Sequence, residues 1–161
     1  MGVSFYAAKR GRKTEEIHHS GYGGYHAIRT YLLACFNVQL AKAFYIFDMA
    51  RTEPERKMLK DCSPYVPEDA LPLFSSSDCE GKWGNDTVKR IAAAVKTAPF
   101  YDKPDAIKTM VEAIVADANP PRADDSTYAG FINTLGWRAE AVSFVENLER
   151  VGAKGCRVYW C

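Results

Sequence analysis

The chain of 161 residues begins and ends in short segments with the alternating pattern of a β-strand, and helical periodicity fills most of the interval between them. The first such segment covers residues 3–7 and the last covers residues 156–161. Two strands alone would be only marginally stable. We therefore expect the two ends of the chain to pair, and residues 62–85 are a source for a third strand.

Apolar residues recur at helical spacing between these strands, as Ile28, Leu32 and Cys35 do in the first helix. Asn37 separates that helix from a second, strongly apolar one. The first predicted helix begins at Tyr25, and the next two cover residues 38–50 and 87–96. A further helix starts at Pro104 and stops at Asn119. The last helical stretch starts at Asp125 or Ser126 and ends at Gly152 or Gly155. The sequence thus predicts an α+β fold, mostly helical, with four or five helices packed on a small sheet formed by the N- and C-terminal strands.

The length matches one domain, and we expect residues 1–161 to form a single globular domain. Prolines, serines and glycines punctuate residues 62–85, which predicts a long irregular connection. The composition, 47% hydrophobic and 25% charged, is typical of globular proteins. No apolar run approaches the roughly 18 residues that span a bilayer, so we expect no membrane partner.

The five cysteines show no metal-binding pattern. Their number is odd, no pair has C-x-x-C spacing, and the histidines lack zinc-ligand spacing. Residues 1–13 contain no apolar region of the kind found in secretory signals. We therefore expect reduced thiols, a cytoplasmic location, no metal and no cofactor, with Cys35 as a buried apolar filler.

The charge is distributed unevenly along the chain. Residues 1–51 hold seven basic and three acidic residues, a balance of +4, whereas the remainder holds fourteen basic and seventeen acidic residues, a balance of −3. The net charge of +1 conceals this difference. An anionic partner is therefore expected at the N-terminal end.

The stretch from Lys9 to Arg29 combines cations, glycines and aromatic rings. We interpret residues 9–13 as a polar loop and residues 18–24 as a flexible glycine-rich stretch that ends just before a helix. Glycine backbone and a helix N-terminus favour phosphate or carboxylate, and tyrosines can stack on bases. The spacing matches neither the P-loop nor the dinucleotide fingerprint. The candidate ligand-binding residues are Lys9, Arg10, Arg12, Lys13, Tyr22, Gly23, Gly24, Tyr25, His26 and Arg29.

All three histidines, His18, His19 and His26, lie in this same stretch. Imidazole titrates near neutral pH, so two of them could act as general acid and base on a phosphodiester, with Arg29 stabilising the developing charge. Adjacent side chains of a strand point to opposite faces, which separates His18 from His19, and loop histidines are poorly preorganised. The simpler interpretation is exposed loop histidines.

Three aromatic residues of the 62–85 segment, Tyr65, Phe74 and Trp83, are candidates for a protein–protein contact. Exposed aromatic side chains on a long loop would suit a host protein partner. The simpler interpretation is that they pack the segment onto its own core.

The start Met-Gly-Val-Ser-Phe-Tyr-Ala and the stretch Gly-Tyr-Gly-Gly-Tyr at residues 21–25, followed by Arg29 and Tyr31, resemble a set of small phage-borne proteins of unknown function. Those proteins begin with Met-Gly and a short hydrophobic strand ending in Tyr-Ala, and carry a Gly-Tyr-Arg stretch soon afterwards. The resemblance covers about residues 1–35. It implies an accessory protein acting on host components, such as a defence system, and transfers no catalytic residue.

The leading hypothesis is a small binding protein for an anionic, phosphate-bearing ligand: a nucleotide, a cyclic oligonucleotide or a nucleic-acid backbone. One alternative is an interaction or inhibitor protein that uses the aromatic segment. The other is a metal-independent phosphodiesterase or ribonuclease that uses His18, His19 or His26.

Overall fold

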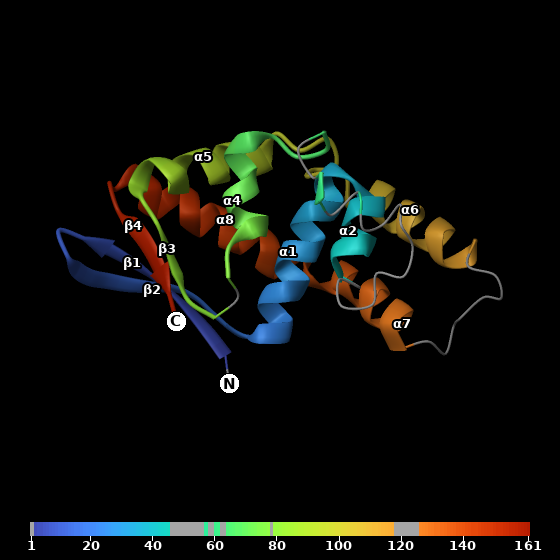
Figure 1. Ribbon diagram of the computed structural model, residues 1–161, viewed down its shortest axis with the longest axis horizontal. Coiled ribbons are helices and arrows are strands. Elements are labelled where there is room, and N and C mark those ends of the chain that lie inside the picture. Colours follow the sequence, from blue (N-terminus) through green and yellow to red (C-terminus); the bar gives the residue numbers. More distant parts are fainter. Residues whose placement is uncertain (1, 46–56, 58–59, 62–63, 78, 118–125) are drawn as a thin grey trace.

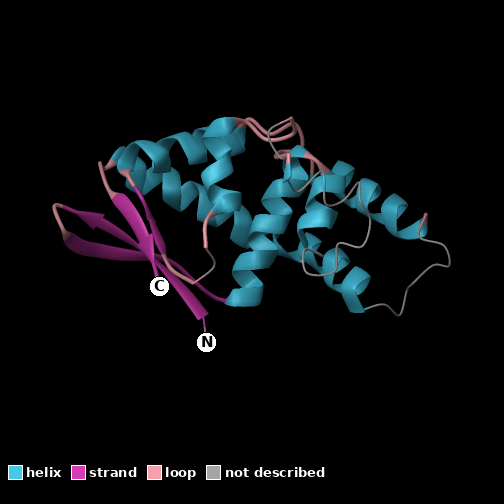
Figure 2. Cartoon of the chain, in the orientation of Figure 1, coloured by secondary structure: helices cyan, strands magenta, loops and turns pink. Residues whose placement is uncertain are grey.

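The computed structural model describes residues 2–45, 57, 60–61, 64–77, 79–117 and 126–161. Its helices lie to one side of a four-stranded sheet (Figures 1 and 2). This confirms the predicted α+β class, mostly helical. The strands are β1 (Gly2–Lys9), β2 (Arg12–Gly21), β3 (Gly81–Trp83) and β4 (Arg157–Trp160). The helices are α1 (Tyr22–Phe36), α2 (Val38–Tyr45), η2 (Glu68–Ala70), α4 (Leu71–Ser75), α5 (Asn85–Lys96), α6 (Pro104–Ala116), α7 (Ser126–Asn133), η3 (Thr134–Trp137) and α8 (Arg138–Ala153).

The sheet has the order β2-β1-β4-β3, and every neighbouring pair is antiparallel. The predicted pairing of the two chain ends is confirmed, because Phe5 lies opposite Trp160 and Tyr6 opposite Tyr159. The third strand from residues 62–85 is confirmed as well, since β3 pairs with the outer edge of β4. The N-terminal and C-terminal strands therefore occupy the two central positions of the sheet.

Strand β2 contradicts the prediction of a polar loop at residues 9–13 and a flexible stretch at residues 18–24. Most of these residues form a β-hairpin, in which Lys9 pairs with Arg12 across a two-residue turn. The two turn residues, Arg10 and Gly11, have φ values of 51° and 77°, as the commonest tight hairpin turn requires. The prediction failed because β2 exposes most of its side chains, and only Ile17 is buried.

The inward face of the sheet contributes to a cluster of aromatic residues in the core. Phe5 is fully buried, and its ring lies against rings from both the sheet and the helices. The centroid distances are 4.7 Å to Tyr25 of α1, 5.1 Å to Phe144 of α8 and 5.3 Å to Trp160 of β4. Phe5 thus joins the sheet to α1 and α8.

Helix α1 lies at the centre of the molecule and is buried on nearly all sides. It begins at Tyr22, three residues earlier than predicted, and ends at the predicted break. Asn37 accepts a hydrogen bond from the backbone N–H of Leu40 through its side chain, at 2.8 Å, and so caps α2. The predicted extension of α2 to residue 50 lies outside the described residues.

The remaining helical predictions are confirmed with small shifts. Helices α5, α6 and α8 occupy the predicted positions, and α7 and η3 precede α8 within the same predicted stretch. Residues 62–85 are less irregular than predicted, because η2, α4 and β3 lie within them. Cys35 is buried as expected. Within the described residues, no helix is long and apolar enough to cross a membrane.

Gly81 provides a test of the packing between β3 and β4. A Cβ atom at this position would lie 2.2 Å from the buried Trp160 ring, whose Nε1 donates to the carbonyl of Ser77. We expect Gly81→Ala to lower the free energy of unfolding by about 1–3 kcal/mol, because the ring must move. Urea denaturation measures this change.

The matched control is Gly23→Ala, in the first turn of α1, where an added Cβ meets nothing within 4 Å. This variant should be neutral or stabilising by up to about 1 kcal/mol, since alanine favours a helix. Equal destabilisation by both variants would contradict the packing argument.

Candidate functional site

The register of the β1–β2 hairpin separates the predicted ligand-binding residues into two groups. Lys9 pairs with Arg12 at one end, whereas Gly2 pairs with Gly21 at the other, immediately before Tyr22 and α1. A strand of this length spans roughly 24 Å, at about 3.4 Å per residue. The structure therefore does not bring the residues predicted from Lys9 to Arg29 together: the basic hairpin tip and the start of α1 are far apart (Figure 1).

Arg29 and Tyr25 are buried rather than open to a ligand. Arg29 is 3% exposed, and its Nη1 donates to the backbone carbonyl of Ser76 at 3.0 Å. Its guanidinium lies 4.6 Å from the Tyr25 ring centroid and 5.3 Å from that of Phe44. The side chain ties α1 to the segment after α4, so we correct its assignment from ligand contact to structural contact.

The glycines of the predicted phosphate loop lie inside α1, not before it. Gly23 and Gly24 both belong to the first turn of the helix. A Cβ on Gly24 would lie 2.9 Å from the Trp137 ring, which gives this glycine a packing role. Tyr22 packs against the core from the same turn and is half-buried.

The three histidines do not converge on one another. His18 is half-buried beside Phe144, at a centroid distance of 5.4 Å, whereas His19 lies on the opposite face of β2, with Nδ1 2.6 Å from the Ser4 hydroxyl. His26, on α1, stacks on Phe44 at 5.0 Å. Neither His18 nor His19 is in a loop, which corrects that interpretation. Across the described residues, no group of three His, Cys, Asp or Glu side chains could hold a metal ion.

The three aromatic residues predicted as a contact surface are also dispersed. Trp83 is 4% exposed, and its Nε1 donates to the Ser76 hydroxyl at 3.1 Å. Phe74 is half-buried and packs edge-on to Phe36 and Phe44, while Tyr65 is 39% exposed. The simpler interpretation, packing onto the core, holds for Trp83 and Phe74.

A different group of polar and aromatic residues gathers on the sheet face that points away from the helices, called here the outer face. Strand pleating places alternate residues on this side, where they are exposed or half-buried. The outer face carries Ser4 and Tyr6 from β1, Lys13, Glu16 and His19 from β2, Lys82 from β3, and Arg157 and Tyr159 from β4.

Two tyrosines lie side by side at the middle of the outer face. Tyr6 and Tyr159 are directly opposite on the central strands, with ring centroids 5.5 Å apart and an angle of 32° between the rings. The Lys13 ammonium lies 2.9 Å from the Tyr6 ring centroid. A cation over an exposed ring contributes about 0.5–1 kcal/mol, so Lys13 is held only weakly.

Cations predominate around these rings. Lys13, Lys82 and Arg157 are exposed on the outer face, and among the strand residues described there Glu16 is the one acidic side chain, 3.8 Å from the His19 ring. Arg10 and Arg12 extend the positive charge at the hairpin tip, whereas Lys9 turns away and donates to the carbonyl of Lys154. The outer face can therefore offer both positive charge and aromatic rings to a ligand.

The sequence prediction missed Tyr6, Lys82, Arg157 and Tyr159. The available signal was the alternation of the terminal strands, which sets Tyr6 apart from buried Phe5 and Ala7. The alternation alone does not show that Tyr6 and Tyr159 are close. They come together because β1 and β4 are neighbours in the sheet.

A hollow of about 280 Å³ between η2, α4 and α5 suits an anion less well than the outer face, because Glu68 and Asp69 contribute carboxylates to its wall. Arg90 also lines it, and forms an ion pair with Asp69 at 3.5 Å.

Comparison with protein-family models, with curated proteins and with solved structures finds no match to this chain. A functional proposal therefore depends on the geometry described above.

Two groups on β2 and the Cys35 thiol on α1 have shifted pKa values. Burial, reinforced by the neighbouring His19, lowers the pKa of His18 below its ordinary 6.5. A hydrogen bond from Arg150 at 2.9 Å lowers the pKa of the Glu15 carboxyl below 4.5. Burial raises the pKa of the Cys35 thiol to about 12, which keeps it neutral and unreactive.

These shifts predict how stability depends on pH. As the pH falls, His18 takes up a proton at a higher pH in the unfolded chain than in the folded protein, which stabilises the unfolded state. The contribution of neutral His18 to the free energy of unfolding is therefore complete above pH 6.5 and is lost as the pH falls toward the folded pKa. We expect the melting temperature to fall from about pH 7.5 to about pH 5, and His18→Gln to flatten this part of the profile. Differential scanning fluorimetry across that range measures the slope.

Glu15→Gln is the control, because the Glu15 contribution is present above pH 4.5 and is lost only as pH falls below it. This variant should change the melting temperature below pH 4.5 and leave its dependence on pH above about pH 5 unchanged. A His18→Gln profile parallel to the wild type throughout would contradict the assignment.

Proposed function

We propose that this protein binds an anionic, phosphate-bearing ligand on the outer face of its sheet. The observation that carries the proposal is the cluster of Lys13, Lys82 and Arg157, three exposed cations from three strands, whereas Glu16 is the one acidic side chain among the strand residues described on this face. Phosphate groups are a natural partner for such a surface, because lysine and arginine bind them through charge-assisted hydrogen bonds.

The hairpin tip extends this surface beyond the sheet. Arg10 lies in the turn between β1 and β2, and Arg12 is the first residue of β2, so both stand at the tip next to Lys13 in the sequence. An elongated polyanion would meet both the tip and the outer face, whereas a mononucleotide would touch only part of them. The proposal therefore favours the nucleic-acid backbone among the ligands expected from the sequence.

The N-terminal resemblance supports an extension of the proposal to a phage-type accessory protein that acts on host components. This extension depends on sequence similarity over about residues 1–35 and identifies no contact residue. The three histidines lie apart, so the proposal is for a binding protein and not for an enzyme.

Binding to a phosphate polymer tests the proposal. The probes are linear inorganic polyphosphate and a fluorescent oligonucleotide of about 16 nucleotides, near the upper site size of single-strand-binding folds. We expect binding that weakens steeply between about 50 and about 200 mM salt, because phosphate contacts release counterions. Fluorescence anisotropy gives the affinity for the oligonucleotide, and competition gives that for polyphosphate.

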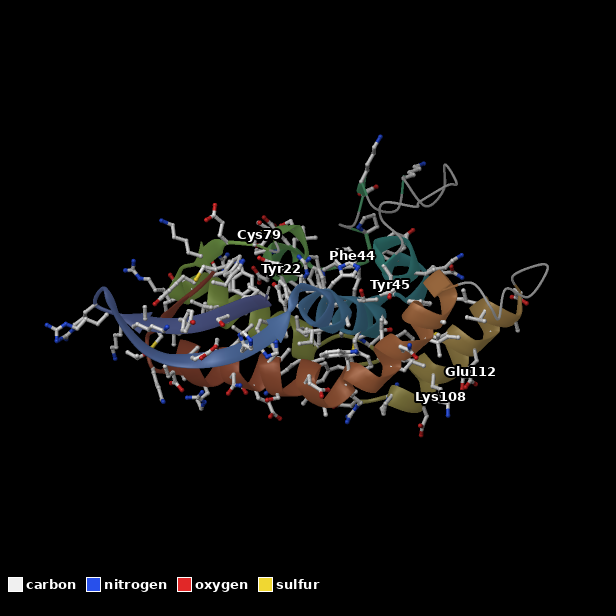
Figure 3. All side chains as sticks on the ribbon, turned by 90° about the horizontal axis from the view of Figure 1, so that it is seen from below. Tyr22, Phe44, Tyr45, Cys79, Lys108 and Glu112 are labelled. Carbon is white, nitrogen blue, oxygen red and sulfur yellow. The ribbon has the colours of Figure 1, made fainter. Side chains whose placement is uncertain are left out.

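The variant Lys82→Gln/Arg157→Gln removes two of the cations and should make the slope of log affinity against log salt shallower by about 1.4. Its matched control is Lys103→Gln/Lys108→Gln. These cations belong to the start of α6, and the labelled Lys108 lies at the end of the molecule opposite the hairpin (Figure 3). Absence of binding to every probe, or equal loss in both variants, would overturn the proposal.

A further inference from the structure

We propose that the ligand is single-stranded nucleic acid, with bases stacked on Tyr6 and Tyr159. This inference depends on the proposed function and adds the chemical class of the ligand. It comes from an observation that phosphate binding alone does not explain: two neighbouring aromatic rings at the centre of the cationic surface.

The tyrosines have the placement that base stacking requires. They come from the two central strands, face away from the core, and lie 5.5 Å apart between centroids. A single-stranded nucleic acid presents the faces of its unpaired bases, which stack on aromatic side chains while the backbone follows cations. Each ring can accept one base, so the pair can hold two successive nucleotides.

The surrounding charges lie where the backbone would pass. Lys13 stands on the β2 side of Tyr6, whereas Lys82 lies opposite Tyr159 on β3. Arg157 is two residues from Tyr159 on the same face of β4. Cations therefore flank the tyrosine pair on both sides, along the direction that crosses the strands.

A duplex would use this surface poorly. Its base faces are stacked internally, so it could offer only phosphates to the cations and would leave both rings unused. Inorganic polyphosphate has no base at all. The geometry thus predicts a preference for single strands over both of these polyanions, independent of sequence, because every base has an aromatic face.

Lys13 is positioned to exchange partners on binding. Its ammonium lies over the Tyr6 ring, and a cation over an exposed ring is held less strongly than a stacked base. A base arriving on Tyr6 would displace the ammonium, which then lies beside the incoming phosphate. The same side chain covers the ring in the free protein and pairs with the backbone in the complex.

An abasic oligonucleotide is the most direct probe, because it keeps the phosphate backbone and removes the bases. We expect the wild-type protein to bind a single strand at least about tenfold more tightly than an abasic strand or a duplex of equal length. Fluorescence anisotropy at one fixed salt concentration measures the affinity for the single strand, the abasic strand and the duplex. DNA and RNA single strands are measured separately, which shows which of the two nucleic acids is preferred.

Substitution of the tyrosines separates stacking from charge. Tyr6→Leu and Tyr159→Leu should each weaken single-strand binding by about tenfold and leave abasic and polyphosphate binding unchanged, whereas Tyr6→Phe and Tyr159→Phe should retain the wild-type preference. Circular dichroism checks that each variant is folded, and the comparison of probes on wild-type protein stands even where a variant is not.

The outcomes distinguish this inference from the proposed function. A preference for single strands that the leucine variants lose and the phenylalanine variants keep supports stacking. Equal affinity for single, abasic and duplex probes overturns the inference and leaves phosphate binding standing. Absence of binding to any polyanion overturns both.

Discussion

The antiparallel pairing of β1 with β4 is the contact on which the rest of the structure depends. It places Phe5 opposite Trp160, so the beginning of the chain is held against its end. Closing so long a segment costs conformational entropy, although that cost grows only slowly with length. Burial of the Phe5 ring among Tyr25, Phe144 and Trp160 offsets the cost, because each aromatic ring removes a large apolar area from water. The helices between the strands are thereby confined to one side of the sheet.

The pleat of these strands divides neighbouring residues between the core and the outer face. Phe5 is buried and Tyr6 faces outward, and Trp160 and Tyr159 repeat this division on β4. On β3, Trp83 packs inward and Lys82 faces outward. The same register that completes the aromatic core therefore brings the two tyrosines and the surrounding cations together. A shift of one residue in either central strand would exchange the two sets.

Sequence patterns predicted the class of fold and the positions of the main helices, because apolar periodicity reports directly on burial. The terminal strands and their pairing were predicted as well. Strand β2 was not, since Ile17 is its only buried residue and its polar side chains look like those of a loop. The residues predicted as one site do not come together, for a related reason: residues that are close in the sequence lie apart in the fold. The hairpin carries Lys9 away from α1, and Arg29 lies inside the molecule, where its charge contacts aromatic rings and a backbone carbonyl. Tyr6 and Tyr159, at opposite ends of the chain, could be joined only once the strand order was known.

Contacts with the helices hold the outer face in place from behind. On β2, Glu15 pairs with Arg150 and Lys154 of the α8 region, and the Asn147 side chain donates to the carbonyl of Ile17 at 3.0 Å. On the other side, the Asn85 side chain donates to the carbonyls of Gly152 and Cys156, which fixes the chain just before β4. The edge strand β2 is thus anchored to the α8 region, and the chain before the central strand β4 is anchored to the first residue of α5. A surface built on rigid elements loses little conformational entropy when it binds. In the proposed complex, ordering on binding would be largely confined to the exposed side chains of Lys13, Lys82 and Arg157, because the tyrosine pair is already arranged in the free protein.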